Sequence, residues 1–466
     1  MKNRLLLPLM LLAGCTVGPD YKRPEVEVPV SYKQYGDWKP AQPADLKPRG
    51  DWWVMFGDRE LDALMKKVDV SNQSIAAAEA QVRVSAALTA QARASWWPTV
   101  GATAQVTKSK PSGTTGPIVG NTTNERTIYS LPLQASWEVD LWGRIRRLVE
   151  SGDAGTAASA SDLINARLSA QATLAQNYFG LRALDLQKQL LDATAEAYGR
   201  TLQLTRNRYD AGVVSRLDVV QAETQYNSAR AQALDSTVQR AQLENAIAVL
   251  TGTPAPSFSI GPGSLAASPP PVPTAGVPAE LLERRPDVAS AERRVEQANA
   301  QIGVAKAAWF PVATLNGSYG FQSAQSALWF TAPSNFWSMG VALALTIFDG
   351  GRRAAVSDQA MANYDITVAN YRGTVLQAFA EVEDNLAALR ILEQEAEVQA
   401  DTVRAAQQSL DITQNQYKAG IATILQVVVA QAALLNAQNT AISIRNRRMA
   451  ATVLLVKALG GGWNEK

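Results

Sequence analysis

Few residues in this chain could carry out covalent or metal chemistry. Among its 466 residues there is no histidine and a single cysteine, Cys15. The chain therefore offers no Ser-His-Asp or Cys-His nucleophile pair, no histidine-liganded zinc site and no internal disulfide. Composition leaves carboxylate or lysine chemistry open. One acidic run, Glu-Val-Glu-Asp at 381–384, lies in a stretch of mixed charge that predicts a solvated helix face. We therefore expect no enzyme.

Charge and length exclude one class of partner and set the scale of the fold. The chain carries 44 Lys+Arg against 42 Asp+Glu, and 47% of its residues are apolar. Nucleic-acid binding needs a basic face, which this balance does not favour, so we expect no nucleic-acid partner. The length alone would allow roughly two to four ordinary domains.

The N-terminus predicts a targeting signal and gives the cysteine a use. Lys2 and Arg4 precede an apolar run over residues 5–12, a pattern typical of a secretory signal and too short to span a bilayer. The Leu-Ala-Gly-Cys sequence that ends at Cys15 resembles the lipobox of bacterial lipoproteins. That resemblance implies cleavage after residue 14, acylation of Cys15 (palmitate included) and, because Thr16 follows instead of Asp, sorting to the outer membrane. The alternative is an ordinary signal with an unrelated cysteine.

The chain repeats itself at a spacing of 208 residues. The sequence Tyr-Asp-Ala-Gly-Val at 209–213 returns as Tyr-Lys-Ala-Gly-Ile at 417–421, and Gly-Arg at 143–144 returns at 351–352. A period this long indicates duplication of a whole domain, not a solenoid. Eight prolines fall within 254–278, which predicts a linker between the halves.

Each half is expected to hold the same elements in the same order: a helix, two strands and a long helical hairpin. One predicted helix, 144–209, would be about 100 Å long at 1.5 Å per residue, which suits coiled-coil or helical-barrel packing. An extended stalk without a lumen is the alternative. The predicted organisation begins with a signal peptide at 1–14 and a lipidated segment at 15–58 that packs on an equatorial region. The first repeat spans 59–252, with strands at about 98–108 and 127–140 and a hairpin at about 144–251, and a Pro-rich equatorial linker follows at 253–285. The second repeat spans 286–459, with strands at about 311–322 and 336–348 and a hairpin at about 352–459, and a tail at 460–466 ends the chain.

The predicted strands carry the membrane argument. Apolar and polar residues alternate over 129–139 and 337–347, and more weakly over 99–108 and 312–322. This period of two matches a lipid-facing barrel strand, although a half-buried soluble sheet would show it too. No segment after the signal predicts a transmembrane helix, so a crossing would use strands. Four strands cannot close a barrel, two copies would give a barrel filled by side chains, and three copies could enclose water. We therefore expect a trimer.

This layout resembles the outer-membrane efflux duct family, the TolC-like and OprM-like proteins, in the lipoprotein branch that serves resistance-nodulation-division (RND) pumps. The motifs that carry the resemblance stand at 15–24, 137–144, 283–288 and 458–463. The resemblance implies an α+β membrane protein with an internal two-fold repeat. Its trimeric, twelve-stranded transmembrane β-barrel, with four strands per chain, would continue into a long periplasmic α-helical barrel.

The same resemblance implies a function without covalent chemistry. The chain would be the exit duct of a tripartite RND-type efflux system in the Gram-negative outer membrane, conducting toxic small molecules such as drugs passively. Expected partners are two further copies of the chain, a periplasmic adaptor, an inner-membrane RND transporter and outer-membrane lipid. Apart from lipid on Cys15, no cofactor or metal is expected. The alternatives are an outer-membrane component of a protein secretion system with the same fold, and a non-conducting coiled-coil lipoprotein.

The hairpin ends are the predicted working parts of this duct. Tight turns are expected at Gly212 and Gly420, and these residues together with Val213 and Ile421 are expected to contact the adaptor. Many family members carry Asp at the start of the second returning helix, where this chain has uncharged residues. We therefore hypothesise an apolar gate that closes by dewetting, with Val and Leu as mere packing positions being the alternative. The residues assigned to the gate are Leu425, Gln426, Val428 and Val429, with a polar network of Arg216 and Asp218.

Overall fold

The computed structural model describes residues 16–25, 50–110, 112, 125–266, 268–270 and 285–461. The predicted signal peptide, Cys15, residues 26–49 of the predicted lipidated segment, residues 267 and 271–284 of the Pro-rich linker and residues 462–466 lie outside the described residues. The chain divides into two compact units. Among the described residues, unit 1 holds 16–25, Gln81–Ser159 and Ala291–Tyr371, and unit 2 holds the remainder.

Apart from α2 (Arg59–Ser71), the described α-helices occur in pairs of equal length, which confirms the internal repeat. The shortest pair has 22 residues in each member, the longest 67 and the third 35. The long helices and the returning helices each start 208 residues apart, as the sequence predicts. These pairs are α3 (Gln73–Ala94) with α7 (Pro286–Ala307), α4 (Arg144–Asp210) with α8 (Arg352–Lys418), and α5 (Arg216–Leu250) with α9 (Ile424–Ala458).

Both long helices begin where an aspartate satisfies free backbone donors of the first turn. Asp140 accepts the N–H groups of Ile145 and Arg146 at 3.2 and 2.9 Å. Asp349 likewise accepts the N–H groups of Gly351 and Arg353 at 3.1 and 3.2 Å. A carboxylate at a helix N-terminus also interacts favourably with the helix dipole, so each strand-to-helix junction fixes the start of its helix.

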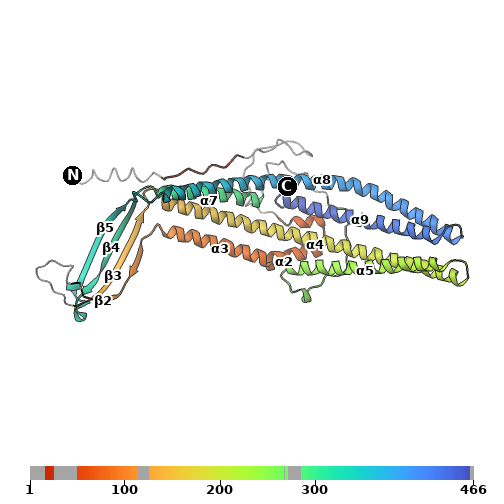
Figure 1. Ribbon diagram of the computed structural model, residues 1–466, viewed down its shortest axis with the longest axis horizontal. Helices are drawn as coiled ribbons and strands as arrows, with labels where there is room; N and C mark the ends of the chain where they lie inside the picture. The colour runs from red at the N-terminus through yellow and green to blue at the C-terminus, as the bar shows by residue number, and fades with distance from the viewer. Residues whose placement is uncertain are drawn as a thin grey trace. The chain divides into compact units, whose positions relative to one another are not determined.

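Unit 1 contains one antiparallel sheet to which both repeats contribute (Figure 1). The strand order is β1-β3-β4-β5, and β2 also pairs with β3. The pairing of β3 with β4 runs from Tyr129↔Ser323 to Val139↔Ala313, so the two repeats meet along this ladder. The strands are β1 (Thr99–Ala102), β2 (Gln105–Ser109), β3 (Arg126–Val139), β4 (Val312–Ser323) and β5 (Asn335–Ala344).

The first expected strand, 98–108, is broken into β1 and β2, which pair end to end with the same edge of β3, so the described sheet keeps the four predicted strand positions. Ala102 pairs with Leu133 and Gln105 with Ser130, so the break lies opposite Pro132. Proline has no N–H to donate to a neighbouring strand, and a ladder opposite it is interrupted. The contact that remains is the Thr103 N–H donating to the Pro132 carbonyl at 3.2 Å.

The last strand is shorter than expected, ending at Ala344 instead of 348. Ala344 pairs with Val312, the first residue of β4, which follows Pro311. Beyond Ala344 the strand therefore has no backbone partner in the described sheet. Leu345 and Ile347, predicted to continue the strand, are 52% and 90% exposed in the single chain.

Unit 2 has its largest core where α2 (Arg59–Ser71) packs against α4. The apolar residues of α2 recur at helical spacing, and Leu61 and Met65 are fully buried together with Leu174 and Leu181 of α4. Each such side chain stabilises the fold by about 1.5–3 kcal/mol. This core anchors the middle of α4 and thereby the hairpin that α4 and α5 form.

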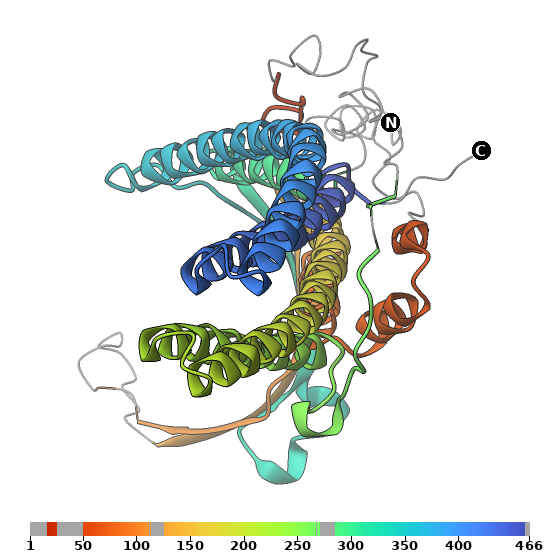
Figure 2. The same ribbon diagram turned by 90° about the vertical axis from the view of Figure 1, so that its right-hand side faces the viewer.

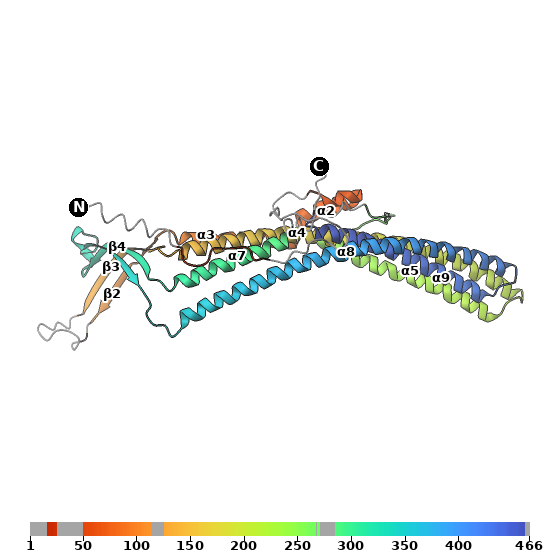
Figure 3. The ribbon, with the colours of Figure 1, turned by 90° about the horizontal axis from the view of Figure 1, so that it is seen from above.

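The two hairpins of unit 2 turn at the same end of that unit, as Figures 2 and 3 show. The α4–α5 and α8–α9 hairpins contact each other through Leu191, Ala233 and Leu435. One described helix, α9, is long and apolar enough to cross a membrane by length and composition, and 33% of its most apolar window is buried. Its buried residues pack on α8 and α4.

Candidate functional site

Residues 16–24, called the strap below, dock on helices of both repeats within unit 1. The Val17 N–H donates to the Trp142 carbonyl at 3.0 Å, at the junction of β3 and α4. Asn299 of α7 donates from Nδ2 to the Pro19 carbonyl at 3.0 Å, and Arg23 pairs with Glu292 at 3.0 Å. The strap therefore runs from the junction of β3 and α4 along α7 to Glu292, near the start of that helix. Trp52 and Trp53 of the same predicted segment 15–58 lie in the core of unit 2, and packing of this segment on an equatorial region stays a prediction.

A buried arginine of α4 holds the strap in place. Arg147, whose side chain is 4% exposed, donates to Asp20 at 2.9 Å and to Glu150 at 2.8 Å. It also donates to the carbonyls of Val17 and Gly18, each at 3.4 Å. Burial lowers the pKa of Arg147, but the bonds to Glu150 and Asp20 outweigh it and raise the pKa on balance. The guanidinium therefore remains a permanent cation beneath the strap.

Two glycines allow the strap to approach α7 this closely. Gly18 has φ of +106°, and a Cβ there would lie 2.5 Å from the Cα of Gly303. A Cβ on Gly303 would in turn lie 2.7 Å from Cγ of Arg147. Sequence reasoning missed this crossing, because no single-sequence signal distinguishes a glycine needed for close approach from one in a loop.

The predicted turns at the hairpin ends have the same geometry in both repeats. Gly212 and Gly420 have φ of +74° and +78°, the left-handed region that glycine adopts without strain. The Val213 N–H donates to the Arg208 carbonyl at 2.8 Å, and the Ile421 N–H donates to the Gln416 carbonyl at 2.9 Å. Val213 and Ile421 are 64% and 78% exposed, so both predicted adaptor contacts lie on the surface of the chain.

Asp218 and Gln426, both assigned to the gate from sequence, occupy equivalent positions that cap the returning helices. The Asp218 carboxylate accepts the Ser215 N–H at 2.8 Å, and the Gln426 side-chain oxygen accepts the Thr423 N–H at 2.8 Å. Both residues complete capping boxes, which provide hydrogen-bond partners for free backbone N–H groups at the starts of α5 and α9. Within the single chain the described contacts of Asp218 are those of the capping box, so the polar network of Arg216 and Asp218 stays a prediction.

The apolar residues assigned to the gate separate into two groups. Leu425 and Val429 are 54% and 61% exposed, and their spacing of four residues puts them on one face of α9. Val428 is buried in a cluster with Leu410 and Leu434, so it is a packing position. The structure therefore brings Leu425 and Val429 together at the surface and removes Val428 from that surface.

A tyrosine of the second hairpin sits on the first hairpin at these ends. Tyr417 of α8 is 4% exposed, and its hydroxyl lies 3.2 Å from Oγ1 of Thr205 in α4. Arg208 of α4 donates to the Tyr417 carbonyl at 2.8 Å and places its guanidinium carbon 4.7 Å from the centre of the ring. We call this contact the in-chain seat. The sequence showed Tyr417 only as half of the repeated motif, and its partners could not be inferred without the packing.

Tyr417 of the in-chain seat also lines a groove of about 520 Å³, which is bordered by α4, α8 and α9. Its lining is mixed, with Leu204, Leu410 and Leu434 beside Arg200 and Asp411. Among the residues that the structure describes, no group of three or more His, Cys, Asp or Glu could hold a metal ion. The surface near the turns thus offers packing and polar contacts.

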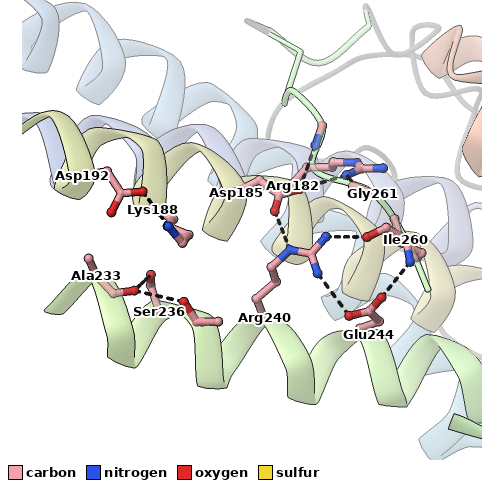
Figure 4. A network of polar contacts seen from close by, with 12 residues as sticks. Arg182, Asp185, Lys188, Asp192, Ala233, Ser236, Arg240, Glu244, Ile260 and Gly261 are labelled. Carbon is pink, nitrogen blue, oxygen red and sulfur yellow. Dashed lines mark hydrogen bonds and ion pairs between the residues drawn. The ribbon is translucent and has the colours of Figure 1, made fainter. Parts of the chain in front are cut away.

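A second polar cluster fastens the first residues of the linker to the first hairpin (Figure 4). Asp185 of α4 accepts from Arg240 of α5 at 2.6 Å, from Arg182 at 2.9 Å and from the Gly263 N–H at 3.0 Å. Arg240 also donates to the Ile260 carbonyl at 2.6 Å. The cluster, called the linker clamp below, consists of Arg182, Asp185, Arg240 and Glu244.

Known proteins resemble the chain over nearly its whole length. A family model described as outer membrane efflux protein matches residues 64–253 and 277–461. The probable efflux pump outer membrane protein TtgC of Pseudomonas putida is 32% identical over 467 residues, which cover 99% of this chain and 96% of that protein. A crystal structure of a membrane protein from Pseudomonas aeruginosa has a TM-score of 0.87 and 30% identity over 97% of this chain and 99% of that one. The outer-membrane channel OprN has a TM-score of 0.86 and 28% identity over 96% of this chain and 100% of that one.

Proposed function

Because the chain belongs to the outer membrane efflux protein family, we propose that it is the outer-membrane exit duct of a tripartite RND-type efflux system. The observation that carries this proposal is a sheet built from both repeats and joined to two long helical hairpins. The same fold is present over 96% of the chain in a protein described as an outer-membrane channel. The predicted fold class is thereby confirmed, and the family is one of efflux proteins, not of enzymes.

In this proposal the duct conducts passively. Toxic small molecules, such as drugs, pass from an inner-membrane RND transporter and its periplasmic adaptor through the duct to the exterior. The exposed turns around Val213 and Ile421 supply a surface for the adaptor. Engagement of the hairpin ends by the adaptor opens a path that is closed at rest, so the work of this chain is shape and closure.

The same proposal includes assembly of three copies in the outer membrane. The strand β5 lies at an edge of the described sheet. One of its faces is apolar and uncovered in the single chain, because Trp337, Met339 and Val341 are 73–75% exposed. Residues 352–370 of α8 contain no buried side chain in the single chain. Apolar edge strands and uncovered helices need partners, and three copies with four strand positions each would close a ring wide enough for water.

The function is tested by conductance and by resistance. The purified full chain in planar bilayers is expected to give discrete channels, and a deletion strain is expected to regain resistance to a panel of toxic compounds when the gene is restored. A trimer that never conducts would support the coiled-coil lipoprotein instead. Loss of a secreted protein, with unchanged resistance, would support the secretion component.

Lipid on Cys15 is a further part of the proposal, supported by the docking of the strap directly after it. Replacement Cys15→Ser is expected to abolish incorporation of labelled palmitate, because serine offers no thiol for the lipoprotein pathway. The mass of the mature chain should fall accordingly. The proposed β-barrel spans the membrane by itself, so the variant should stay in the membrane fraction, and the label is the readout. Retained label on the serine variant would exclude acylation at this residue.

The gate hypothesis now rests on Leu425 and Val429, the exposed apolar pair on α9. Replacement Leu425→Ala should raise the resting conductance, because the smaller side chains leave a wider apolar opening, which water enters more easily. Replacement Val429→Asp should raise cation selectivity, because one carboxylate per copy would line the same level. The comparison variant is Val428→Ala, which should lower stability and leave selectivity unchanged, since this side chain is buried. Unchanged conductance and selectivity in both exposed-site variants would eliminate this gate.

A further inference from the structure

The in-chain seat has an unused counterpart in the same chain. Each residue of the seat has an equivalent 208 residues away: Tyr209 for Tyr417, Thr413 for Thr205 and Gln416 for Arg208. These equivalents lie on the same two helices, α4 and α8, at the same distance from their turns. The duplication therefore produces a second tyrosine and a second place on which a tyrosine could sit.

The second tyrosine is left uncovered in the single chain. Tyr209 is 38% exposed, whereas its equivalent Tyr417 is 4% exposed. Gln416 is exposed and Thr413 is partly exposed, so the place equivalent to Thr205 and Arg208 is open as well. In the in-chain seat the first repeat provides Thr205 and Arg208 while the second provides the tyrosine. In the uncovered set the roles are reversed: the first repeat provides the tyrosine, Tyr209, and the second repeat provides Thr413 and Gln416.

Closing a ring of two-repeat chains brings the reversed pair together. When repeats alternate around a closed ring, each repeat meets one neighbour within its own chain and one in the next copy. We propose that Tyr209 of one copy docks on Thr413 and Gln416 of the adjacent copy, forming an inter-copy seat. This inference rests on the proposed homotrimeric duct, and its committed partner is a second copy of this chain.

The two seats differ in one respect that affects their strength. The in-chain seat has the Arg208 guanidinium over the ring and a charged donor on the Tyr417 carbonyl. The inter-copy seat has the neutral Gln416 in that place, so it lacks the cation–π contact and the charge-assisted hydrogen bond. The hairpins of one chain are therefore held together more firmly than hairpins of adjacent copies, and the ends separate first between copies.

Cross-linking tests the placement. The full chain in its native membrane would carry Tyr209→Cys with Gln416→Cys and be treated with a short bifunctional thiol reagent. Covalent species containing two and three chains are expected on a denaturing gel. The pair Arg208→Cys with Tyr417→Cys should link only within a chain and yield no larger species. Replacement of Asn415, one helical step from Gln416, with Cys in the Tyr209→Cys background is the matched control and should yield little product.

A complementary test restores the missing cation. Replacement Gln416→Arg is expected to slow dissociation of the copies in detergent about tenfold and to lower the resting conductance, because it rebuilds the in-chain contact between copies. The same change in a Tyr209→Ala background should have no effect. An equal effect with and without Tyr209, or a conducting trimer that gives no cross-link between copies, would overturn the inter-copy seat alone. A chain that forms no oligomer would overturn both the seat and the proposed duct.

Discussion

Replacement Gly18→Val is expected to release the strap and to lower the yield of assembled protein in the outer membrane. Gly18 has φ of +106°, which a β-branched residue adopts only with strain, and its Cβ would lie 2.5 Å from the backbone of Gly303. Strain and overpacking together should cost about 3 kcal/mol or more. Release of the strap also leaves Arg147 without Asp20 and two backbone carbonyls.

The measurement is protease sensitivity of the strap together with the fraction of trimer recovered from outer membranes. A matched glycine control is Gly373→Ala in α8, where a Cβ would meet nothing within 4 Å. That variant should be tolerated and even gain stability, since alanine favours a helix by about 0.5–1 kcal/mol. Protection of the strap in Gly18→Val equal to that in the unaltered chain would show that the close crossing is unimportant.

Replacement Asp185→Ala should strongly destabilise the first hairpin. Asp185 is 5% exposed and lies between Arg182 and Arg240, which are 3% and 15% exposed. Removing one partner of a buried ionic cluster costs about 3–5 kcal/mol. We expect the lower part of that range, because Arg182 still pairs with Glu60 and Arg240 with Glu244. The Gly263 N–H also loses its acceptor, so the linker should detach from the hairpin.

A second carboxylate drawn in Figure 4 provides the comparison for Asp185→Ala. Asp192 pairs with Lys188 one turn away at 2.5 Å, and the two side chains are 55% and 41% exposed. Replacement Asp192→Ala should change stability by no more than about 0.5 kcal/mol, the usual value of an exposed pair on a helix. Denaturant unfolding and proteolysis at the linker would measure both variants. Equal stability of the two would refute the importance assigned to the linker clamp.

The sequence predicts those parts of the fold that depend on local pattern. The repeat spacing of 208 residues locates α4, α5, α8 and α9, and the glycines locate their turns, because helix length and chain reversal are encoded in neighbouring residues. Pro132 is also the cause of the break between β1 and β2. The sequence alone does not reveal this effect, because only the strand pairing places Thr103 opposite Pro132. Alternation along 98–108 concealed that break.

The contacts that were not predicted involve residues far apart in the chain. Val428 and Val429 are neighbours of identical type, and only the packing on α8 shows that one is buried and the other exposed. The sequence shows the charge of Asp218, on which its predicted gate role rests, whereas its hydrogen bond to Ser215 depends on the turn geometry. The strap, the in-chain seat and the linker clamp each join segments separated by many residues, and a single sequence carries no record of such pairings.

The capping of α9 by Gln426 has a consequence for how such a duct can diversify. An amide oxygen and a carboxylate oxygen satisfy the Thr423 N–H equally well in shape, so this position can gain or lose a charge while the turn stays intact. Under the gate proposed for the hairpin ends, the charge at this position could therefore drift through a single-residue exchange that folding does not oppose. A lineage could then retune the proposed gate without first acquiring compensating mutations elsewhere.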